Sequence, residues 1–312
     1  MTNKEKYQEF CKQEESIPLY SKDWWLDVVC DEGGWDVVLV EERGEVVASM
    51  PFYLKKRAFF KAITLPKLTQ TMGPYIKYPK NQTLYKKLSY EKNIMSMLIE
   101  QLPKVDMFNQ SFHHSITNWL PFYWKGYKQS TGYTYIIEDL SDMEHVFKNF
   151  TSSTRKEIRK AQKSGIEIID SDDIEAFYEI IKITFQKKNL QARESLEFIK
   201  SIYKSAKERD SVMMKFAVKD GVIYSASLCF YDKTTLYAVI GGSNRNLKNL
   251  LGSQQLLKWE SMKFASNKML SFDFEGSMIE GVEYRNRAFG ATQKPYFNLT
   301  KTDSKLLRLL QV

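Results

Sequence analysis

Residues 37–56 read VVLVEERGEVVASMPFYLKK, and residues 215–233 read KFAVKDGVIYSASLCFYDK. Each stretch has alternating apolar residues, a turn that contains glycine, and a second strand-like run, which is the pattern of a β-hairpin. Both stretches also contain Ala-Ser-x-x-Phe-Tyr, which begins at Ala48 in the first and at Ala226 in the second, an offset of 178 residues. The sequence therefore predicts the same hairpin twice.

The segments that follow the two hairpins come in the same order. Each hairpin is followed by a strand, then by an amphipathic helix, then by another strand. The expected ranges are 61–65, 82–101 and 105–109 after the first hairpin, and 235–240, 251–266 and 270–275 after the second. The repeated order favours a duplicated unit. We predict an α+β fold with two domains, 1–145 and 146–312, each a mixed, mostly antiparallel sheet flanked by helices.

Four more helices are expected where the second half begins. Ser141 or Asp142 is placed to cap a short helix after a strand at 133–138. The remaining three helices are expected over 153–164, from Asp172 or Asp173 to about Lys188, and over 193–209. Gly165 is a typical signal for the end of the first of these three.

Composition limits the class of protein. The chain has 312 residues, of which 43% are hydrophobic and 27% are charged, and these values exclude disordered and low-complexity classes. No apolar run approaches the ~20 residues of a spanning helix, and the first residues lack the apolar core of a signal peptide. Cys11, Cys30 and Cys229 lack CxxC spacing and indicate reduced thiols. We therefore expect a cytoplasmic protein without integral membrane association.

The net charge of +8 lies mostly in the second half of the chain. Residues 1–140 are nearly neutral, whereas residues 141–312 contain 28 basic and 21 acidic side chains. A positive half suits an anionic ligand such as a phosphorylated cofactor, RNA or a polyanionic acceptor. A basic surface that serves only solubility accounts for the same numbers.

The expected helix 153–164 carries a basic face. Arg155 and Arg159 are four residues apart, and Lys160 adds a further charge to the helix. The planar guanidinium group of arginine can donate two hydrogen bonds to a phosphate. Two interpretations stay open: an anion-binding face, or a helix face that is merely solvated.

A pair of carboxylates stands at the end of the expected strand 270–275. In a strand, Phe272 and Phe274 point to one side, while Asp273 and Glu275 point to the other. A partly buried carboxylate has a raised pKa and can take a proton from an attacking amine. The alternative is structural ion pairing with the basic residues that follow, Arg285, Arg287 and Lys294.

A third candidate site is the stretch Gly241-Gly242-Ser243-Asn244 at the end of a strand. The glycines permit close approach of a ligand to the backbone, and Ser243 and Asn244 offer donors, although a plain turn has the same composition. GxGxxG, GxxxxGK[ST] and GxSxG are absent, and the histidines have no ligand spacing. We therefore expect neither a dinucleotide site nor a metal site.

Taken together, these segments resemble the Fem-type branch of the GNAT superfamily of N-acyltransferases. The similar segments are RKEIRKAQKSG at 155–165 and FDFEGS at 272–277, with MPFY at 50–53 and PKLTQTMGP at 66–74. The resemblance covers most of the chain. It implies two GNAT-like domains in tandem and the transfer of an acyl group to an amine.

The resemblance also implies roles for the candidate residues. The amine acceptor, a small molecule or glycan precursor of the cell envelope or a polysaccharide, is expected in a cleft between the domains. There it meets the catalytic carboxylates Asp273 and Glu275, together with Ser277. The backbone from Tyr237 to Gly242 is expected to stabilise the oxyanion of the reaction. The remaining binding roles fall to Arg285 for a carboxylate or phosphate, and to Arg155, Arg159 and Lys160 for an anionic part of donor or acceptor.

The donor expected from the resemblance is acetyl-CoA or another acyl-CoA, and no metal is implied. Residues 249–253, Asn-Leu-Leu-Gly-Ser, are at best a remnant of the loop that binds the CoA pyrophosphate in GNAT enzymes. Two alternatives remain. One is an aminoacyl-tRNA donor, as in the enzymes that build peptidoglycan cross-bridges, and the other is a catalytically silent double-GNAT protein that binds a ligand.

Overall fold

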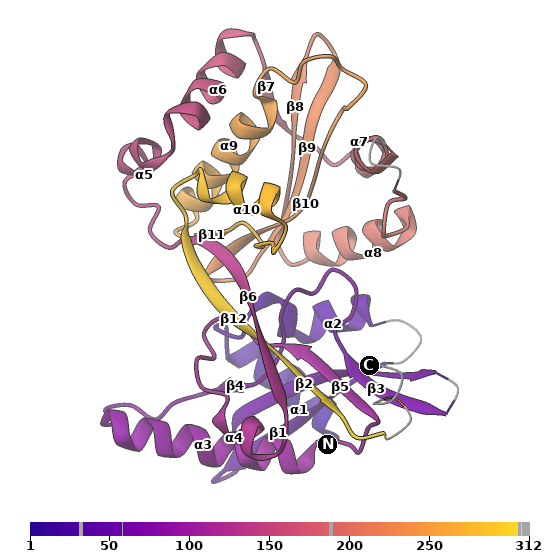
Figure 1. The fold of residues 1–312 in the computed structure, drawn as a ribbon, viewed down its shortest axis with the longest axis vertical. Helices are drawn as coiled ribbons and strands as arrows, with labels where there is room; N and C mark the ends of the chain where they lie inside the picture. The colour runs from indigo at the N-terminus through magenta and orange to yellow at the C-terminus, as the bar shows by residue number, and fades with distance from the viewer. Residues whose placement is uncertain (31–33, 58, 187–189, 305–306, 308–312) are drawn as a thin grey trace. The chain divides into compact units, whose positions relative to one another are not determined.

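The computed structural model describes residues 1–30, 34–57, 59–186, 190–304 and 307 (Figure 1). The chain forms two compact units. The first consists of Met1–Gly132 and Pro295–Val312, and the second of Tyr133–Lys294. The predicted division at 145/146 differs from this in two ways: the first unit ends earlier in the sequence, and the C-terminal segment belongs to it.

The first unit has a sheet in the order β1-β2-β3-β5-β12. Its strands are β1 (Trp35–Glu42), β2 (Glu45–Arg57), β3 (Phe60–Thr64), β5 (Met107–Ser111) and β12 (Thr292–Thr302), and β4 (Tyr75–Ile76) pairs with β2. All neighbours are antiparallel except β3 and β5, which are parallel. Its helices are α1 (Asn3–Gln13), η1 (Leu19–Ser21), α2 (Asp23–Val29), α3 (Leu84–Gln101) and α4 (Leu120–Trp124).

The second unit has a sheet in the order β6-β11-β10-β9-β8-β7. The strands are β6 (Lys128–Ile137), β7 (Glu167–Asp170), β8 (Val212–Lys219), β9 (Val222–Tyr231), β10 (Thr235–Ser243) and β11 (Ser271–Asp273). Only β10 and β11 are parallel. The helices are α5 (Met143–Asn149), α6 (Ser152–Lys163), α7 (Ile174–Gln186), α8 (Leu196–Lys207), α9 (Ser253–Asn267) and α10 (Glu280–Arg287). The predicted α+β class, with mixed and mostly antiparallel strand pairing flanked by helices, is confirmed.

In each unit, one strand comes from the other half of the sequence. In the second unit, β6 is antiparallel to β11, and in the first unit β12 is antiparallel to β5. The prediction placed the strand at 133–138 in the first domain and recognised no strand at β12. Local sequence indicates that a segment is extended, but it does not say which partner the segment will find.

The predicted helices agree with the structure to within about three residues where both are described. The ranges 82–101, 153–164 and 251–266 correspond to α3, α6 and α9. Asp142 caps α5 by accepting the His145 N–H at 2.9 Å. The helix expected from Asp172 or Asp173 is α7, while its expected end at Lys188 lies outside the described residues.

The two hairpins are structurally equivalent at an offset of 177 residues. Arg43–Gly44 and Asp220–Gly221 form the two turns, and all four residues have positive φ. The register then shifts at the same place in each hairpin, at Val40–Glu41 and at Ala217–Val218. The turn and the register shift thus lie at equivalent positions in both hairpins. The two units therefore contain the same hairpin, including this irregularity.

The matching letters that suggested the duplication are therefore one residue out of register. Phe52 packs in the core cluster of the first unit, and its geometric counterpart Cys229 packs in that of the second. Phe230, which the letters align with Phe52, points to the opposite face, since a slip of one residue reverses every side chain of a strand. The order of the elements was the valid signal for duplication; the shared letters were coincidental.

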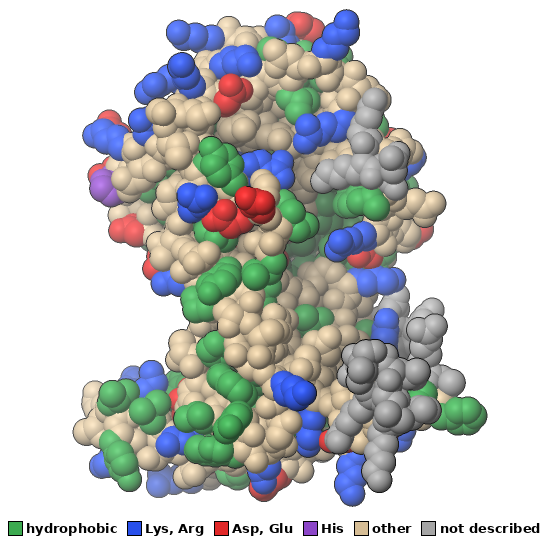
Figure 2. Space-filling view, viewed as in Figure 1, with side chains coloured by type: hydrophobic (Ala, Val, Ile, Leu, Met, Phe, Trp, Pro, Cys, Tyr) green, Lys and Arg blue, Asp and Glu red, His purple; other side chains and the backbone are tan. Residues whose placement is uncertain are grey.

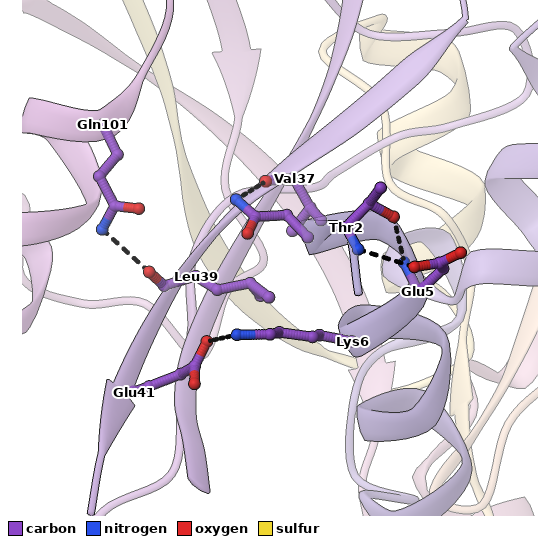
Figure 3. Close-up of polar contacts among 8 residues, drawn as sticks. Thr2, Glu5, Lys6, Val37, Leu39, Glu41 and Gln101 are labelled. Carbon is purple, nitrogen blue, oxygen red and sulfur yellow. Dashed lines mark hydrogen bonds and ion pairs between the residues drawn. The ribbon is translucent and has the colours of Figure 1, made fainter. Parts of the chain in front are cut away.

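The edge strand β1 is covered by helices of its own unit (Figure 3). The carbonyl of Val37 accepts from the side-chain amide of Asn3 in α1 at 3.2 Å. The carbonyl of Leu39 accepts from the amide of Gln101 at the end of α3 at 2.9 Å. Side chains of two helices thus occupy carbonyls that β1 would otherwise offer to another strand, which protects the edge of the sheet from unwanted pairing.

Candidate functional site

A gap in the sheet of the second unit creates the candidate site. The strands β10 and β11 pair only from Thr235–Tyr237 to Ser271–Asp273, and β11 ends there. Strand β10 continues to Ser243, and its register against β9 shifts between Tyr237 and Ile240. Beyond Tyr237, β11 no longer pairs with β10, and residues 238–242 line a pocket of about 480 Å³. Backbone groups of β10 are therefore available to a ligand.

The pocket lies within the second unit and draws its walls from five other elements or segments. They are the N-terminal parts of α6 and α9, the middle of β9, the segment around Phe272–Gly276 at the end of β11, and α10 with the residues that follow it. The walls combine aromatic and aliphatic side chains with a similar number of polar ones. A concave cavity in which apolar side chains and polar groups converge is typical of a ligand site.

The two predicted catalytic carboxylates occupy different environments. Asp273 is 2% exposed and accepts hydrogen bonds from the Thr134 hydroxyl and from the backbone N–H of Glu275, the latter at 2.8 Å. Glu275 has a φ of 64° and lines the pocket together with Phe272 and Phe274. The strand alternation predicted for this segment ends at Phe274, because the left-handed backbone turns Glu275 away from the face of Asp273. Asp273 itself does not line the pocket and supports the turn that presents Glu275.

Burial raises the pKa of Asp273 to about 6, against the hydrogen bonds from Thr134 and Glu275, which lower it. Between about pH 4 and pH 6 the folded state keeps a proton that the unfolded state releases, so this group makes stability fall as pH rises through that window. We expect Asp273→Asn to lack this loss, because the amide keeps an acceptor oxygen but cannot ionise.

The measurement is denaturant unfolding of wild type and Asp273→Asn at intervals from pH 4 to pH 7.5. The unfolding free energy of the variant, relative to wild type, is expected to increase by about 2–3 kcal/mol across this range. A difference that stays constant with pH would show that Asp273 does not titrate in this window.

The pocket that Glu275 lines also contains a mostly buried lysine. The Lys258 ammonium lies 4.6 Å from the centre of the Phe274 ring and 5.9 Å from that of Phe289. Burial lowers the pKa of Lys258 to about 8; Cys229 opposes this shift and the charge of Arg285 adds to it. Within the described part of the chain, Lys258 makes no ion pair or hydrogen bond. A cation held between aromatic rings without a counter-ion is suited to receive negative charge from a ligand.

An unsatisfied amide lies in the same pocket. Asn286 is 3% exposed, and its Nδ2 has no hydrogen-bond partner among the described residues. A buried donor without a partner costs stability, and such groups are rare in proteins. Arg285, the preceding residue, is exposed at the pocket, where its Nε donates to the Gly281 carbonyl of its own helix at 2.9 Å. Asn286, Arg285 and Lys258 together offer donors and positive charge to one ligand.

The first turn of α9 borders the pocket at Gln254 and Gln255. The preceding Gly252 has a φ of 78°, caps the helix without a side-chain hydrogen bond, and lies against the Glu157 carbonyl of α6. A Cβ at this position would overlap that carbonyl oxygen. The glycine therefore allows the start of α9 to pack on α6, which directs the positive end of the α9 dipole toward the pocket.

We expect Gly252→Ala to lower the unfolding free energy by about 2–4 kcal/mol, because it adds a backbone clash to the strain of a positive φ. Gly221→Ala is the matched control, since Gly221 has a φ of 73° with open space around its Cα. Gly221→Ala should lower the unfolding free energy only by the strain of a positive φ, about 1 kcal/mol. Urea unfolding measures both, and equal losses would contradict the close packing of α9 on α6.

The predicted basic face of α6 does not reach the pocket. Arg155 donates to two backbone carbonyls at the end of α5. Arg159 lies 5.6 Å from the centre of the Phe147 ring, and Lys160 is 3.8 Å from a carboxylate oxygen of Glu157. The pocket touches other residues of this helix. The structure thus gives these three cations local contacts in α5 and α6, and none of them lines the pocket, so their role in holding the substrate stays a prediction.

Among the remaining predicted residues, only Gly242 and Arg285 line the pocket. A Cβ on Gly242 would lie 2.7 Å from the Thr184 hydroxyl, so the glycine permits α7 to pack on β10. Tyr237 donates to a carboxylate in the turn before β10, and Asn244 donates to a backbone carbonyl of β9. The backbone N–H of Ser243 donates to the Thr184 hydroxyl of α7 at 2.8 Å, and the Ser277 hydroxyl accepts the backbone N–H of Ile279 at 3.0 Å. These four polar residues therefore make hydrogen bonds to neighbouring protein groups and do not line the pocket.

Sequence reasoning missed Lys258 and Asn286. Lys258 is the single cation inside the apolar run Leu256–Trp259 on a helix whose buried face was predicted, and this interruption was the available signal. Asn286 stands between two arginines and gives no signal at all. Its burial depends on how α10 packs, which no local pattern encodes.

In the described residues, no group of histidine, cysteine, aspartate and glutamate is placed to bind a metal ion. Across those same ranges no helix is both long and apolar enough to span a bilayer. The free cysteines Cys11, Cys30 and Cys229 are all buried.

The second unit matches a known family. Residues 148–284 match the family model described as an acetyltransferase (GNAT) domain. No curated protein matches the sequence. The matched residues include α6 and α9, the gapped strands β10 and β11, and most of the pocket. This part of the second unit is therefore similar to a GNAT acetyltransferase domain.

Solved structures extend the similarity to the whole chain. A crystal structure of FemX has a TM-score of 0.71 at 14% identity, covering 95% of this chain and 96% of its own. The C-terminal domain of a putative lysylphosphatidylglycerol synthetase from Agrobacterium fabrum has a TM-score of 0.58 at 11% identity, with 99% and 95% covered. A tandem GNAT protein from the clavulanic acid pathway has 0.53 at 10% identity, with 97% and 95% covered. The predicted resemblance to Fem-like double-GNAT proteins is confirmed at the level of the fold.

Proposed function

We propose that this protein is an N-acyltransferase that moves an acyl group from a phosphate-bearing donor to an amine of a cell-envelope or polysaccharide precursor. The observation that carries the proposal is the gap between β10 and β11, where the pocket brings Glu275 together with the donors of Lys258 and Asn286. A base and an oxyanion-stabilising group in one cavity are what acyl transfer to an amine requires.

In the proposed reaction the amine nitrogen attacks the carbonyl carbon of the donor, and a C–N bond forms. The carboxylate of Glu275 takes the proton that the nitrogen loses. The carbonyl oxygen becomes an oxyanion, which the Lys258 ammonium and the Asn286 amide stabilise. Collapse of this intermediate breaks the bond to the leaving thiol or hydroxyl, which receives the proton from Glu275. Asp273 is a positioning residue, since it holds the backbone of Glu275.

An acyl-CoA thioester is the first donor that we propose. Arg285 and the start of α9 are the groups available for its phosphates, because both border the pocket and both present positive charge. The usual pyrophosphate loop is not recognisable in the sequence, but Leu251 and Gly252 have successive positive φ values of 53° and 78° before the helix. A backbone turn of this kind can direct N–H groups to an anion.

An aminoacyl-tRNA is the second candidate donor. The likeness of the whole chain to FemX and to a putative lysylphosphatidylglycerol synthetase favours it, since the second name refers to a lysyl product. The 3′ end of a charged tRNA carries phosphates as well, so the same cationic groups would serve. The two donors differ in the number of phosphates that the protein contacts.

The test is a thermal-shift and transfer assay with acetyl-CoA, longer acyl-CoAs and charged tRNAs, using amino-sugar nucleotides and peptide amines as acceptors. A donor that binds the folded state raises the melting temperature. Salt separates the donor classes, because binding that contacts many RNA phosphates weakens much more steeply with salt.

Arg285→Gln and Arg287→Gln are the paired variants for this assay, since only the first of these neighbouring arginines lines the pocket while the second pairs with Glu283. The shift produced by the donor should be lost in Arg285→Gln and kept in Arg287→Gln. If no donor shifts the wild type and no amide product forms, the chain is a silent ligand-binding protein and the proposal is wrong.

A further inference from the structure

Two helices of the first unit expose large apolar side chains on one surface. Tyr85 on α3 is 80% exposed and Trp124 on α4 is 58% exposed. We call the group the aromatic patch, and its members are Leu84, Tyr85, Leu88, Leu120, Tyr123 and Trp124. Figure 2 shows hydrophobic side chains gathered where α3 and α4 lie in Figure 1. An exposed cluster of this kind marks an interaction surface.

The patch is continuous across the two helices. Tyr85, Leu88 and Lys92 follow one another at spacings of three and four residues, so they form a stripe along α3. The stripe ends beside α4, where the Lys92 ammonium lies 5.8 Å from the centre of the Trp124 ring. Further along α3, Ile94, Met95 and Leu98 are buried in the core of the unit. The exposed residues at the start of the helix are therefore additional to the residues that pack in the core.

The part of the sequence that contains the patch residues has an excess of basic residues. Residues 77–128 contain eight lysines and three acidic residues, and one of the lysines, Lys77, pairs with Glu14 at 3.7 Å. Each of the three acids is already engaged: Glu91 is buried and accepts from Tyr78, Glu100 pairs with Lys125 at 3.2 Å, and Asp106 accepts a backbone N–H. Lys86 and Lys87, on the first turn of α3, are exposed between the patch residues. The patch thus combines apolar and aromatic side chains with an excess of positive charge.

This combination fits the surface of an anionic lipid bilayer. Tryptophan and tyrosine place an apolar ring among acyl chains while their polar atoms stay in the headgroup region, and leucine adds apolar area. Lysines at the same level are attracted to the negative charge of phosphatidylglycerol and similar lipids. No described helix can cross a bilayer, so contact would be peripheral.

We propose that the aromatic patch binds the protein reversibly to the surface of anionic membranes. This inference is independent of the pocket chemistry, because all patch residues belong to the first unit and the pocket belongs to the second. It goes beyond the proposed function by giving the enzyme access to acceptors that are anchored in a membrane.

The test is co-sedimentation of the whole protein with vesicles of phosphatidylcholine alone and of phosphatidylcholine mixed with phosphatidylglycerol. Wild type should bind the mixed vesicles, more strongly at low salt. The double variant Tyr85→Ser/Trp124→Ser should bind them at least about tenfold more weakly, since it removes the two rings that enter the interface. Lys86→Gln/Lys87→Gln should reduce the preference for the mixed vesicles. Met278→Ser, an exposed apolar residue of the second unit, is the control and should bind like wild type.

Two further measurements keep the outcomes distinct. Thermal unfolding of each variant checks that it folds, and acyl transfer to a soluble amine should be unchanged in the patch variants whether or not the membrane proposal holds. Analytical ultracentrifugation tests the competing occupant, a second copy of the chain. A wild-type dimer that the Tyr85→Ser/Trp124→Ser variant dissociates, or vesicle binding that this variant leaves intact, would overturn the proposal.

Discussion

Glu275→Gln is expected to reduce kcat for acyl transfer by about 10²–10⁴-fold, the contribution of a general base. The amide keeps the size of the carboxylate but cannot take the proton that the attacking amine loses. The backbone turn that presents residue 275 should survive, because Asp273 accepts the N–H of that residue and not its side chain. The substitution therefore separates chemistry from folding.

The measurement is single-turnover amide formation, followed by mass spectrometry with whichever donor stabilises the wild type. Glu280→Gln is the control, since Glu280 is exposed on α10 and does not line the pocket. Donor affinity should be unchanged in both variants, because the base acts on the acceptor. Turnover of Glu275→Gln within about twofold of wild type, with unfolding curves that coincide, would remove Glu275 from the mechanism.

Lys258→Met is expected to lower kcat/KM by about 10²–10³-fold, which is the usual cost of removing one group that stabilises an oxyanion. Methionine fills a similar volume between Phe274 and Phe289, so the packing of the pocket should persist. Lys258→Arg should recover part of the activity by restoring the charge. Lys263→Met is the matched control on the same helix, because Lys263 pairs with Glu260 at 2.8 Å and lies outside the pocket lining.

The pH profile gives Lys258 a second signature. Burial lowers its pKa to about 8, so the ammonium loses its charge from about pH 8 upward, where an ordinary lysine still keeps it. The kcat/KM of wild type should therefore fall as pH rises through 8, and the residual activity of Lys258→Met should lack this decline. An alkaline decline that is identical in both proteins would assign the titration to another group, such as the acceptor amine.

The fold could be predicted from the sequence because its elements are long and strongly patterned. Apolar periodicity placed α3, α6 and α9 to within two residues, and the turn glycines located both hairpins. Periodicity depends on which face of a segment is buried, and that is a local property. Pairing is not local. The strands β6 and β12 pair with β11 and β5, which lie far away from them in the sequence.

The candidate site was predictable only where a motif coincided with the pocket. Among the predicted residues, Glu275, Gly242 and Arg285 line one pocket. Arg155 was predicted to bind an anion, yet its guanidinium group donates to two backbone carbonyls. Spacing on a helix shows that cations share a face, but it does not show what that face meets. The sequence therefore identifies residues that could bind or react with a ligand more easily than it identifies which of them do so.

The sequence by itself determined the order of the elements, the α+β class, the Fem-like double-GNAT resemblance and the carboxylate strand. These follow from periodicity, turn residues and short motifs, which act over a few residues. Tertiary structure alone decided that Glu275 turns into the pocket, that Lys258 loses its solvent between two rings, and that the Asn286 amide is left without a partner. Burial, desolvation and hydrogen-bond satisfaction depend on groups brought together from distant parts of the chain, so they exist only after the sheet has opened between β10 and β11.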